Sequence, residues 1–247
     1  MQFHFNQKLF TFKKIIFPIL FFASFLSGCA PFTSVEYAFD FSDFDDTPIP
    51  EEVKTWLQNG EQSKVTEDIY KIAGEISGKN RRERLYKAMD YVWNHFSYDN
   101  RLNSIAFVRT ADDIFRSMEL GGCSDFALVQ MVLFRAVGIP SRMVITANVD
   151  WMIRYRSHPL AMTEGHSFIE VYLEDRWYLV DSTYRWLYTN YNPANKSYPH
   201  GEYFIGRGID FWDMGIRSIE DSDNFLRKLA TQYEGDYQDP LYKKKPI

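Results

Sequence analysis

The chain has 247 residues, of which 45% are hydrophobic, 25% charged and 17% aromatic. This length and composition are those of an ordinary globular protein with one sizeable domain and appendages. The formal net charge is −5 and the only basic run is the lysines at 243–245, so we expect no nucleic-acid partner.

The first 28 residues have the three parts of an export signal. Lys8, Lys13 and Lys14 precede an apolar run over residues 15–25, and small residues follow that run. The run is about half of the ~20 residues needed to cross a bilayer, which favours a signal peptide over a retained transmembrane helix. Residues 1–28 are therefore predicted to be a signal peptide.

The signal ends in Leu26-Ser27-Gly28-Cys29, which resembles the lipobox of bacterial lipoproteins. The resemblance implies that Cys29 becomes the first mature residue, carries acyl chains and anchors the chain in a membrane. Ala30 resembles the residue that follows this cysteine in outer-membrane lipoproteins of Gram-negative cells. We therefore expect a lipid-anchored protein of the bacterial cell envelope, at the outer membrane, with residues 29–50 as an acidic tether.

A helical first half follows the tether. Pro50 and the acids after it predict a helix start, and apolar residues at helical spacing predict a second helix that ends at Gly78. A third helix is predicted to begin near Asn80 and to end around 96–98. Its charged face is expected to lie in solvent, and the residues concerned are Arg81, Arg82, Glu83, Arg84 and Lys87.

The next helices prepare a candidate nucleophile. Residues 110–118 predict a short helix, and Gly121-Gly122 predicts a sharp turn before Cys123. The helix that Cys123 begins is apolar almost all round and ends at Gly138, so it should be buried. A thiol at a helix N-terminus meets the positive end of the helix dipole, which favours the thiolate. Cys29 and Cys123 have separate predicted roles, so we expect no disulfide.

The second half reads as a sheet. Residues 142–147 predict a strand, residues 148–163 predict a loop that frames a cleft, and residues 166–173 and 176–181 predict a β-hairpin. If Glu174-Asp175 is a two-residue turn, His166 and Asp181 share one face of the hairpin as diagonal neighbours, within reach of a hydrogen bond.

The C-terminal third gives weaker patterns. Residues 184–214 are expected to complete the sheet and wall the cleft, and residues 221–233 predict a helix. Residues 236–247 are expected to form a C-terminal tail that frays from Asp239 onward.

Three residues supply the parts of acyl-transfer catalysis. Cys123 is a nucleophile, His166 an imidazole that takes and returns its proton, and Asp181 a carboxylate that holds the imidazole. Zinc binding by the same residues is disfavoured because they lack the paired spacing that is usual for zinc ligands. We therefore expect a catalytic triad, with no metal and no cofactor.

Four segments in one order resemble the transglutaminase-like superfamily: Gly122–Ala127, Arg135–Arg142, Gly165–Val171 and Trp177–Thr183. The resemblance implies an α+β, papain-like fold over residues 51–235, with N-terminal helices and the nucleophile helix packed on an antiparallel β-sheet. It also implies that Cys123 is the nucleophile, His166 the general base and acid, and Asp181 its orienting carboxylate. No residue matches the side-chain oxyanion donor of papain-like enzymes, although the backbone amide of Cys123 can serve as one donor.

The predicted function is an envelope-anchored cysteine enzyme that acts on amide bonds through a thioester intermediate. Water as acceptor makes it a peptidase or amidase, and an amine makes it a transglutaminase-type acyl transferase; hydrolysis is favoured, because transfer needs a dry channel for the amine. The expected partners are a peptide or protein substrate in the envelope, peptidoglycan stems included, and the membrane through the N-terminal lipid. The alternative is a non-catalytic binding or scaffolding lipoprotein that retains the transglutaminase-like fold.

Overall fold

The computed structural model describes residues 46–159, 162–240 and 244–246, and it describes side chains up to residue 240. The predicted signal peptide, Cys29 and most of the predicted tether lie outside these residues. Within the described part of the chain, no helix combines the length and the apolar character needed to cross a membrane.

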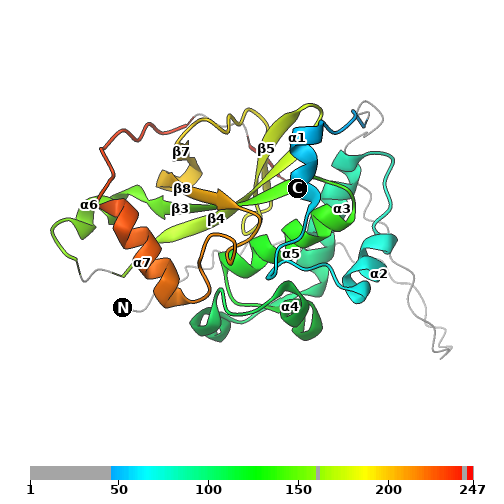
Figure 1. Ribbon diagram of the computed structural model, residues 1–247, viewed down its shortest axis with the longest axis horizontal. Coiled ribbons are helices and arrows are strands. Elements are labelled where there is room, and N and C mark those ends of the chain that lie inside the picture. The colour runs from blue at the N-terminus through cyan, green and yellow to red at the C-terminus, as the bar shows by residue number, and fades with distance from the viewer. Residues whose placement is uncertain (1–45, 160–161, 241–243, 247) are drawn as a thin grey trace, which may run out of the picture. The chain divides into compact units, whose positions relative to one another are not determined.

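An antiparallel sheet forms the centre of the fold (Figure 1). Within the described residues it has seven strands in the order β7-β8-β3-β4-β5-β6-β9. The strands are β3 Ser141–Asn148, β4 Gly165–Leu173, β5 Arg176–Asp181, β6 Trp186–Tyr188, β7 Ser197–Tyr198, β8 Glu202–Gly208 and β9 Lys244–Pro246. A separate parallel pair joins β1 Ser97–Tyr98 to β2 Glu119–Leu120.

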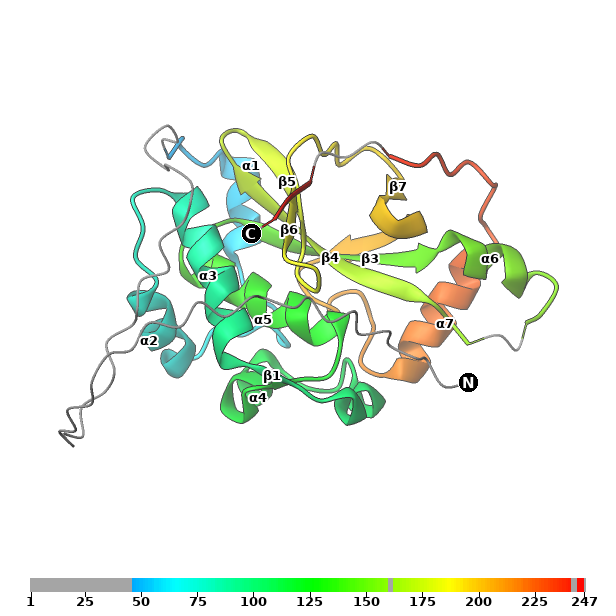
Figure 2. The same cartoon turned by 180° about the vertical axis from the view of Figure 1, so that it is seen from behind.

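Most of the helices lie beside one end of this sheet, whereas α6 and α7 lie at the other end (Figures 1 and 2). The α-helices are α1 Glu51–Lys54, α2 Glu67–Glu75, α3 Arg81–His95, α4 Ala111–Ser117, α5 Cys123–Ala136, α6 Val149–Tyr155 and α7 Ile219–Ala230. Short 3-10 helices are η1 Thr55–Leu57, η2 Asn100–Ile105 and η3 Pro199–Gly201. This combination confirms the predicted α+β class.

Local sequence explains where the main helices begin. Asn80 caps α3 by accepting a hydrogen bond from the backbone N–H of Glu83, at 2.9 Å. Thr110 and Asp113 form a capping box at the start of α4. Helix α5 is buried at every residue from 124 to 135, as its continuous apolar character predicts. It packs against both β3 and β4, which confirms the predicted packing of the nucleophile helix on the sheet.

The hairpin of β4 and β5 has the predicted register. Leu173 pairs with Arg176, and the pairing continues to Ile169 and Val180. Glu174 and Asp175 both have positive φ angles, of 48° and 60°, as a two-residue turn matched to the twist of the strands requires. The two-residue turn therefore sets the face on which each hairpin side chain lies.

The prediction that the charged face of α3 lies in solvent is wrong for Arg81 and Arg82. Arg81 and Arg82 are each 5% exposed. Arg81 pairs with Asp46 at the end of the predicted tether, and Arg82 pairs with Glu174 at the hairpin tip, with Nη2 2.5 Å from Oε2. Helical spacing cannot show these partners because they come from distant parts of the sequence.

The predicted loop over residues 148–163 contains helix α6 instead. Asn148 caps it by accepting a hydrogen bond from the backbone N–H of Trp151, at 3.1 Å. Trp151 and Met152 are fully buried in a cluster with Leu226 of α7, so these apolar residues anchor a helix rather than frame a cleft. The predicted fraying of the C-terminal tail is also wrong for residues 244–246, which pair with β6 as β9.

A buried carboxylate ties the segment between β6 and β8 to the middle of the sheet. Glu170 of β4 is fully buried and forms ion pairs with Arg142 and Arg207. The hydroxyl groups of Tyr191 and Tyr198 donate hydrogen bonds to the same carboxylate. Since a buried charge must be compensated, these contacts hold the chain across the sheet just before residue 200.

Candidate active site

A tight turn presents Cys123 at the start of α5. A Cβ atom on Gly121 would lie 2.8 Å from the carbonyl carbon of Leu102, and one on Gly122 would lie 2.4 Å from Asn103 Oδ1. The contacts at Gly121 are with backbone, so that position needs glycine, whereas a side chain at Gly122 would displace the end of the Asn103 side chain. The two glycines let η2 approach the backbone that precedes the thiol.

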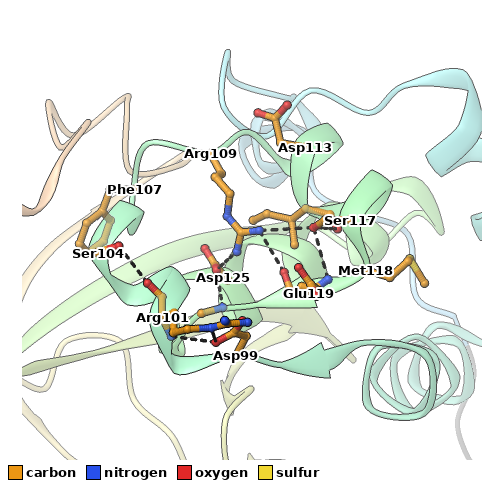
Figure 3. A network of polar contacts seen from close by, with 12 residues as sticks. Asp99, Arg101, Ser104, Phe107, Arg109, Asp113, Ser117, Met118, Glu119 and Asp125 are labelled. Carbon is orange, nitrogen blue, oxygen red and sulfur yellow. Dashed lines mark hydrogen bonds and ion pairs between the residues drawn. The ribbon is translucent and has the colours of Figure 1, made fainter.

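Asp125 fastens this turn from inside the first turn of α5 (Figure 3). Its Oδ2 accepts a hydrogen bond from the backbone N–H of Gly121 at 2.7 Å and forms an ion pair with Arg109. Arg109 also donates to the carbonyl oxygen of Glu119 at 3.1 Å. An acid in the first turn complements the helix dipole, so the network fixes both ends of the Gly121-Gly122 turn.

The sulfur of Cys123 lies among hydrogen-bond donors. Cys123 is half-buried, and the groups that act on its thiol are the side chain of His166 and the hydroxyl and backbone N–H of Ser167. Burial disfavours the thiolate, but the hydrogen bond and the charge of His166 outweigh burial and lower the pKa of the thiol. The site therefore favours a thiolate at Cys123.

His166 links the thiol to Asp181. Its side chain is 14% exposed, and its Nε2 lies 3.0 Å from Asp181 Oδ1. This contact leaves Nδ1 as the ring nitrogen that is free to act on Cys123. Burial disfavours the imidazolium, but the hydrogen bonds with Asp181 and Cys123 raise the pKa of His166 well above its ordinary value. The thiolate and the imidazolium thus stabilise each other.

Asp181 is fully buried at the end of β5. Its Oδ1 also accepts the backbone N–H groups of Thr183 at 3.1 Å and Tyr184 at 3.2 Å. Burial raises its pKa, but the hydrogen bond with His166 and the contact with His200 outweigh burial, so the net pKa is lowered. Trp93 of α3 donates from Nε1 to the carbonyl oxygen of Ser182 at 3.1 Å and so holds the turn that supplies the two amides.

The structure brings the three predicted site residues together although they come from α5, β4 and β5. It also places three residues that the sequence analysis did not single out: Ser167 at the sulfur, His200 at Asp181, and Asn103 beside Gly122. Only Ser167 has a local signal, because it follows His166 directly. The other two come near the site through tertiary contacts. Cys29 lies outside the described residues.

A pocket of about 260 Å³ lies beside Cys123 and His166. Its walls come from η2 and the residues after it, from the start of α5, from β3 and β4, and from α7. Its lining residues are Asn103, Ala106, Phe107, Cys123, Ser124, Ile145, Thr146, Thr163, Gly165, His166, Ser167, Ile219, Ser222, Asp223 and Leu226. The thiol therefore lines a pocket that can hold a small group.

The network in Figure 3 contains its own matched pair of arginines. The Arg109 side chain is 11% exposed and pairs with buried Asp125, whereas that of Arg101 is 87% exposed and pairs with Asp99. Arg109→Ala leaves a buried carboxylate unpaired, so we expect it to lower the free energy of unfolding by about 3 kcal/mol and to slow alkylation of Cys123. Arg101→Ala should change neither quantity. Urea unfolding and iodoacetamide labelling measure both, and equal behaviour of the two variants would contradict the role of Asp125.

Comparison with known proteins gives one family. Residues 70–182 match the model of the transglutaminase-like superfamily. A comparison with curated proteins found no match.

Solved structures that resemble the chain include a protein from Cytophaga hutchinsonii, provisionally assigned as a cysteine protease, with 20% identity and a TM-score of 0.49 over 68% of this chain and 50% of that one. A protein from Parabacteroides distasonis, provisionally assigned as a protease, has 18% identity and a TM-score of 0.35 over 52% of this chain and 25% of that one. A TGase has 16% identity and a TM-score of 0.32 over 61% of this chain and 36% of that one. The matched regions thus span half or less of these structures. The segment 70–182, which matches the model of the transglutaminase-like superfamily, contains Cys123, His166 and Asp181.

Proposed function

We propose that the protein is a cysteine enzyme that acts on amide bonds through a thioester intermediate. The observation that carries this proposal is the placement of Cys123 and His166 in one pocket, with His166 hydrogen-bonded to buried Asp181 at 3.0 Å and lowering the pKa of the thiol. A thiolate–imidazolium pair is the reactive form of a cysteine nucleophile.

The chemical steps follow from this pair. The Cys123 thiolate attacks the amide carbonyl carbon, and a C–S bond forms. His166 gives its proton to the leaving nitrogen as the C–N bond breaks, which leaves a thioester and a neutral imidazole. Water then attacks the thioester, His166 accepts the proton of that water, and the acid product leaves as the thiolate and imidazolium return.

Water is the acceptor that the pocket favours. Its wall on the side of α7 includes the hydroxyl of Ser222 and the carboxylate of Asp223, which accepts a hydrogen bond from Thr163. Such groups hold water in a site. We therefore propose peptidase or amidase activity rather than acyl transfer, on a peptide or protein substrate.

Asn103 is the proposed side-chain donor to the oxyanion. It lines the pocket together with Cys123, and its side-chain amide lies against Gly122, the residue before the nucleophile. The backbone N–H of Cys123 lies in the first turn of α5, where N–H groups have no acceptor within the helix. An amide side chain and a backbone N–H at this position are the two donors that a tetrahedral intermediate requires.

Envelope anchoring through Cys29 is part of the same proposal. It rests on the sequence of residues 1–30, in which a signal-like segment ends in the lipobox-like Leu26–Cys29. A lipid anchor at the outer membrane would place the site near envelope peptides and peptidoglycan stems.

The first prediction concerns the pH dependence of Cys123 alkylation. Because the pKa of this thiol is lowered, iodoacetamide should label it rapidly well below pH 8. His166→Ala removes the group that lowers the pKa, so the labelling midpoint should rise to about 8.5 or above, and labelling at neutral pH should become slow. The measurement is the rate of Cys123 modification, followed by peptide mass spectrometry, on detergent-purified full-length protein from pH 4 to 10. An ordinary thiol profile in both proteins would favour the non-catalytic binding lipoprotein.

The second prediction tests whether Asn103 acts on the oxyanion or on the reactivity of the thiol. Asn103→Ala should slow acylation of Cys123 by p-nitrophenyl acetate about 100-fold, since a donor to the oxyanion is lost. Alkylation by iodoacetamide forms no oxyanion, so its rate should stay unchanged. If both rates fall together, Asn103 acts on the placement of the thiol rather than on the intermediate.

The third prediction concerns the anchor. Cells that express the full-length protein with labelled palmitate should incorporate the label and keep the protein in the membrane fraction. Cys29→Ser should abolish the label and release the protein from that fraction, whereas Cys123→Ser should change neither. Wild-type protein without label, or label that persists in Cys29→Ser, would refute lipidation at Cys29.

A further inference from the structure

The two oxygens of Asp181 have unequal surroundings. Oδ1 accepts hydrogen bonds from His166 and from two backbone N–H groups. Oδ2 is buried and makes no hydrogen bond within the described residues; His200 Nε2 lies 3.4 Å from it, as an ion-pair contact. A buried carboxylate oxygen without a donor is costly, so Oδ2 depends on this second histidine.

The placement of His200 is specific. It lies in η3, between β7 and β8, and has a φ angle of 66°, a region that residues other than glycine seldom adopt. Such a backbone persists only where surrounding contacts hold it. The ring stacks on Trp186, with centroids 5.4 Å apart, and lies 5.1 Å from the ring of Tyr184. Both aromatic residues come from the chain just after Asp181.

The same nitrogen has a second neighbour. Tyr188 Oη lies 3.1 Å from His200 Nε2. A proton on Nε2 can be donated to Asp181 Oδ2 while the tyrosine oxygen also accepts, and the surrounding aromatic faces tolerate a positive ring. The distance to Oδ2 is 3.4 Å, longer than an ordinary hydrogen bond, so the contact acts chiefly through charge.

Besides Tyr184 and Tyr188, a further ionisable group near this pair is Glu202. Glu202 follows η3 and is buried, and its Oε2 accepts a hydrogen bond from Thr146 at 2.7 Å. Burial raises the pKa of Glu202, although the charges of His166 and His200 oppose that rise. The carboxylates of Asp181 and Glu202 therefore both lie near the two histidines.

We propose that His200 is a positioning residue that holds Oδ2 of Asp181 and so keeps Oδ1 directed at His166. This inference rests on the proposed function, because it concerns the carboxylate that sets the His166–Cys123 pair. Without His200 the buried Oδ2 loses its partner, and the carboxylate is free to turn or to take up a proton. His166 then loses the interaction that raises its pKa, and Cys123 loses the imidazolium that stabilises its thiolate.

Two substitutions at residue 200 separate hydrogen bonding from packing. His200→Phe keeps an aromatic ring but has no donor, and His200→Gln keeps an N–H that can reach Oδ2. Tyr188→Phe is the matched control, since it removes the other neighbour of Nε2 and leaves Asp181 and His200 in place. His200→Asn adds a variant that tolerates the left-handed backbone but has a shorter side chain. Thermal unfolding shows which of the four variants fold.

The readouts are the pH profile of Cys123 alkylation, acylation by p-nitrophenyl acetate, and titration of His166 by NMR of the histidine-labelled full-length protein. His200→Phe and His200→Asn should raise the alkylation midpoint by about one pH unit and slow acylation about ten-fold. His166 should then titrate at a lower pH. His200→Gln should restore part of each property, because it keeps the N–H but not the charge, and Tyr188→Phe should match the wild type.

The outcomes distinguish the two proposals. If folded His200→Phe and His200→Asn match the wild type in all three readouts, His200 does not position Asp181. If wild-type Cys123 behaves as an ordinary thiol, the enzyme proposal fails. The NMR titration of His166 still decides whether His200 acts through Asp181, because that measurement needs no reactive thiol.

Discussion

The burial of the Asp181 carboxylate is the constraint on which the site depends. A charge that is fully removed from water must be matched by donors, or the group takes up a proton. Here the donors come from the backbone after β5 and from His166. Helix α3 holds that backbone through Trp93 and through an ion pair between Asp90 and Arg185. Helix α3 therefore supports a carboxylate that lies about 90 residues later in the sequence.

The second constraint acts at the start of α5. The thiol is presented toward His166 by a turn in which η2 packs on Gly121 and Asn103 lies beside Gly122, and Asp125 fastens this turn. The same contacts bring Asn103 to the rim of the pocket. The interaction between Cys123 and His166 then couples the two constraints, since it lowers the pKa of Cys123 and raises that of His166. The placement of α5 and the burial of Asp181 thus both act on the Cys123–His166 pair.

The pattern of sequence predictions follows the range of the interactions. Helix α5 and the β4–β5 hairpin were predicted well because continuous apolar residues and a two-residue turn act locally. The same reasoning put Arg81 and Arg82 in solvent and found a loop where α6 lies. Those predictions failed because the partners come from distant parts of the chain. Asp46 and Glu174 pair with the two arginines, and the buried cluster that contains Leu226 of α7 packs against α6. Helical or strand spacing within one segment cannot reveal such partners.

By itself the sequence determined the helix that Cys123 begins and the shared face of His166 and Asp181, because helix and strand periods fix which side chains lie together. Its fold class was implied by the resemblance of four segments to the transglutaminase-like superfamily. Only the tertiary structure decided which polar groups complete the site. Asn103 and His200 lie 20 and 19 positions from the nearest site residue, and each arrives through packing of its own segment. Which polar groups contact each other depends on which distant segments pack together, and local sequence patterns do not contain that information.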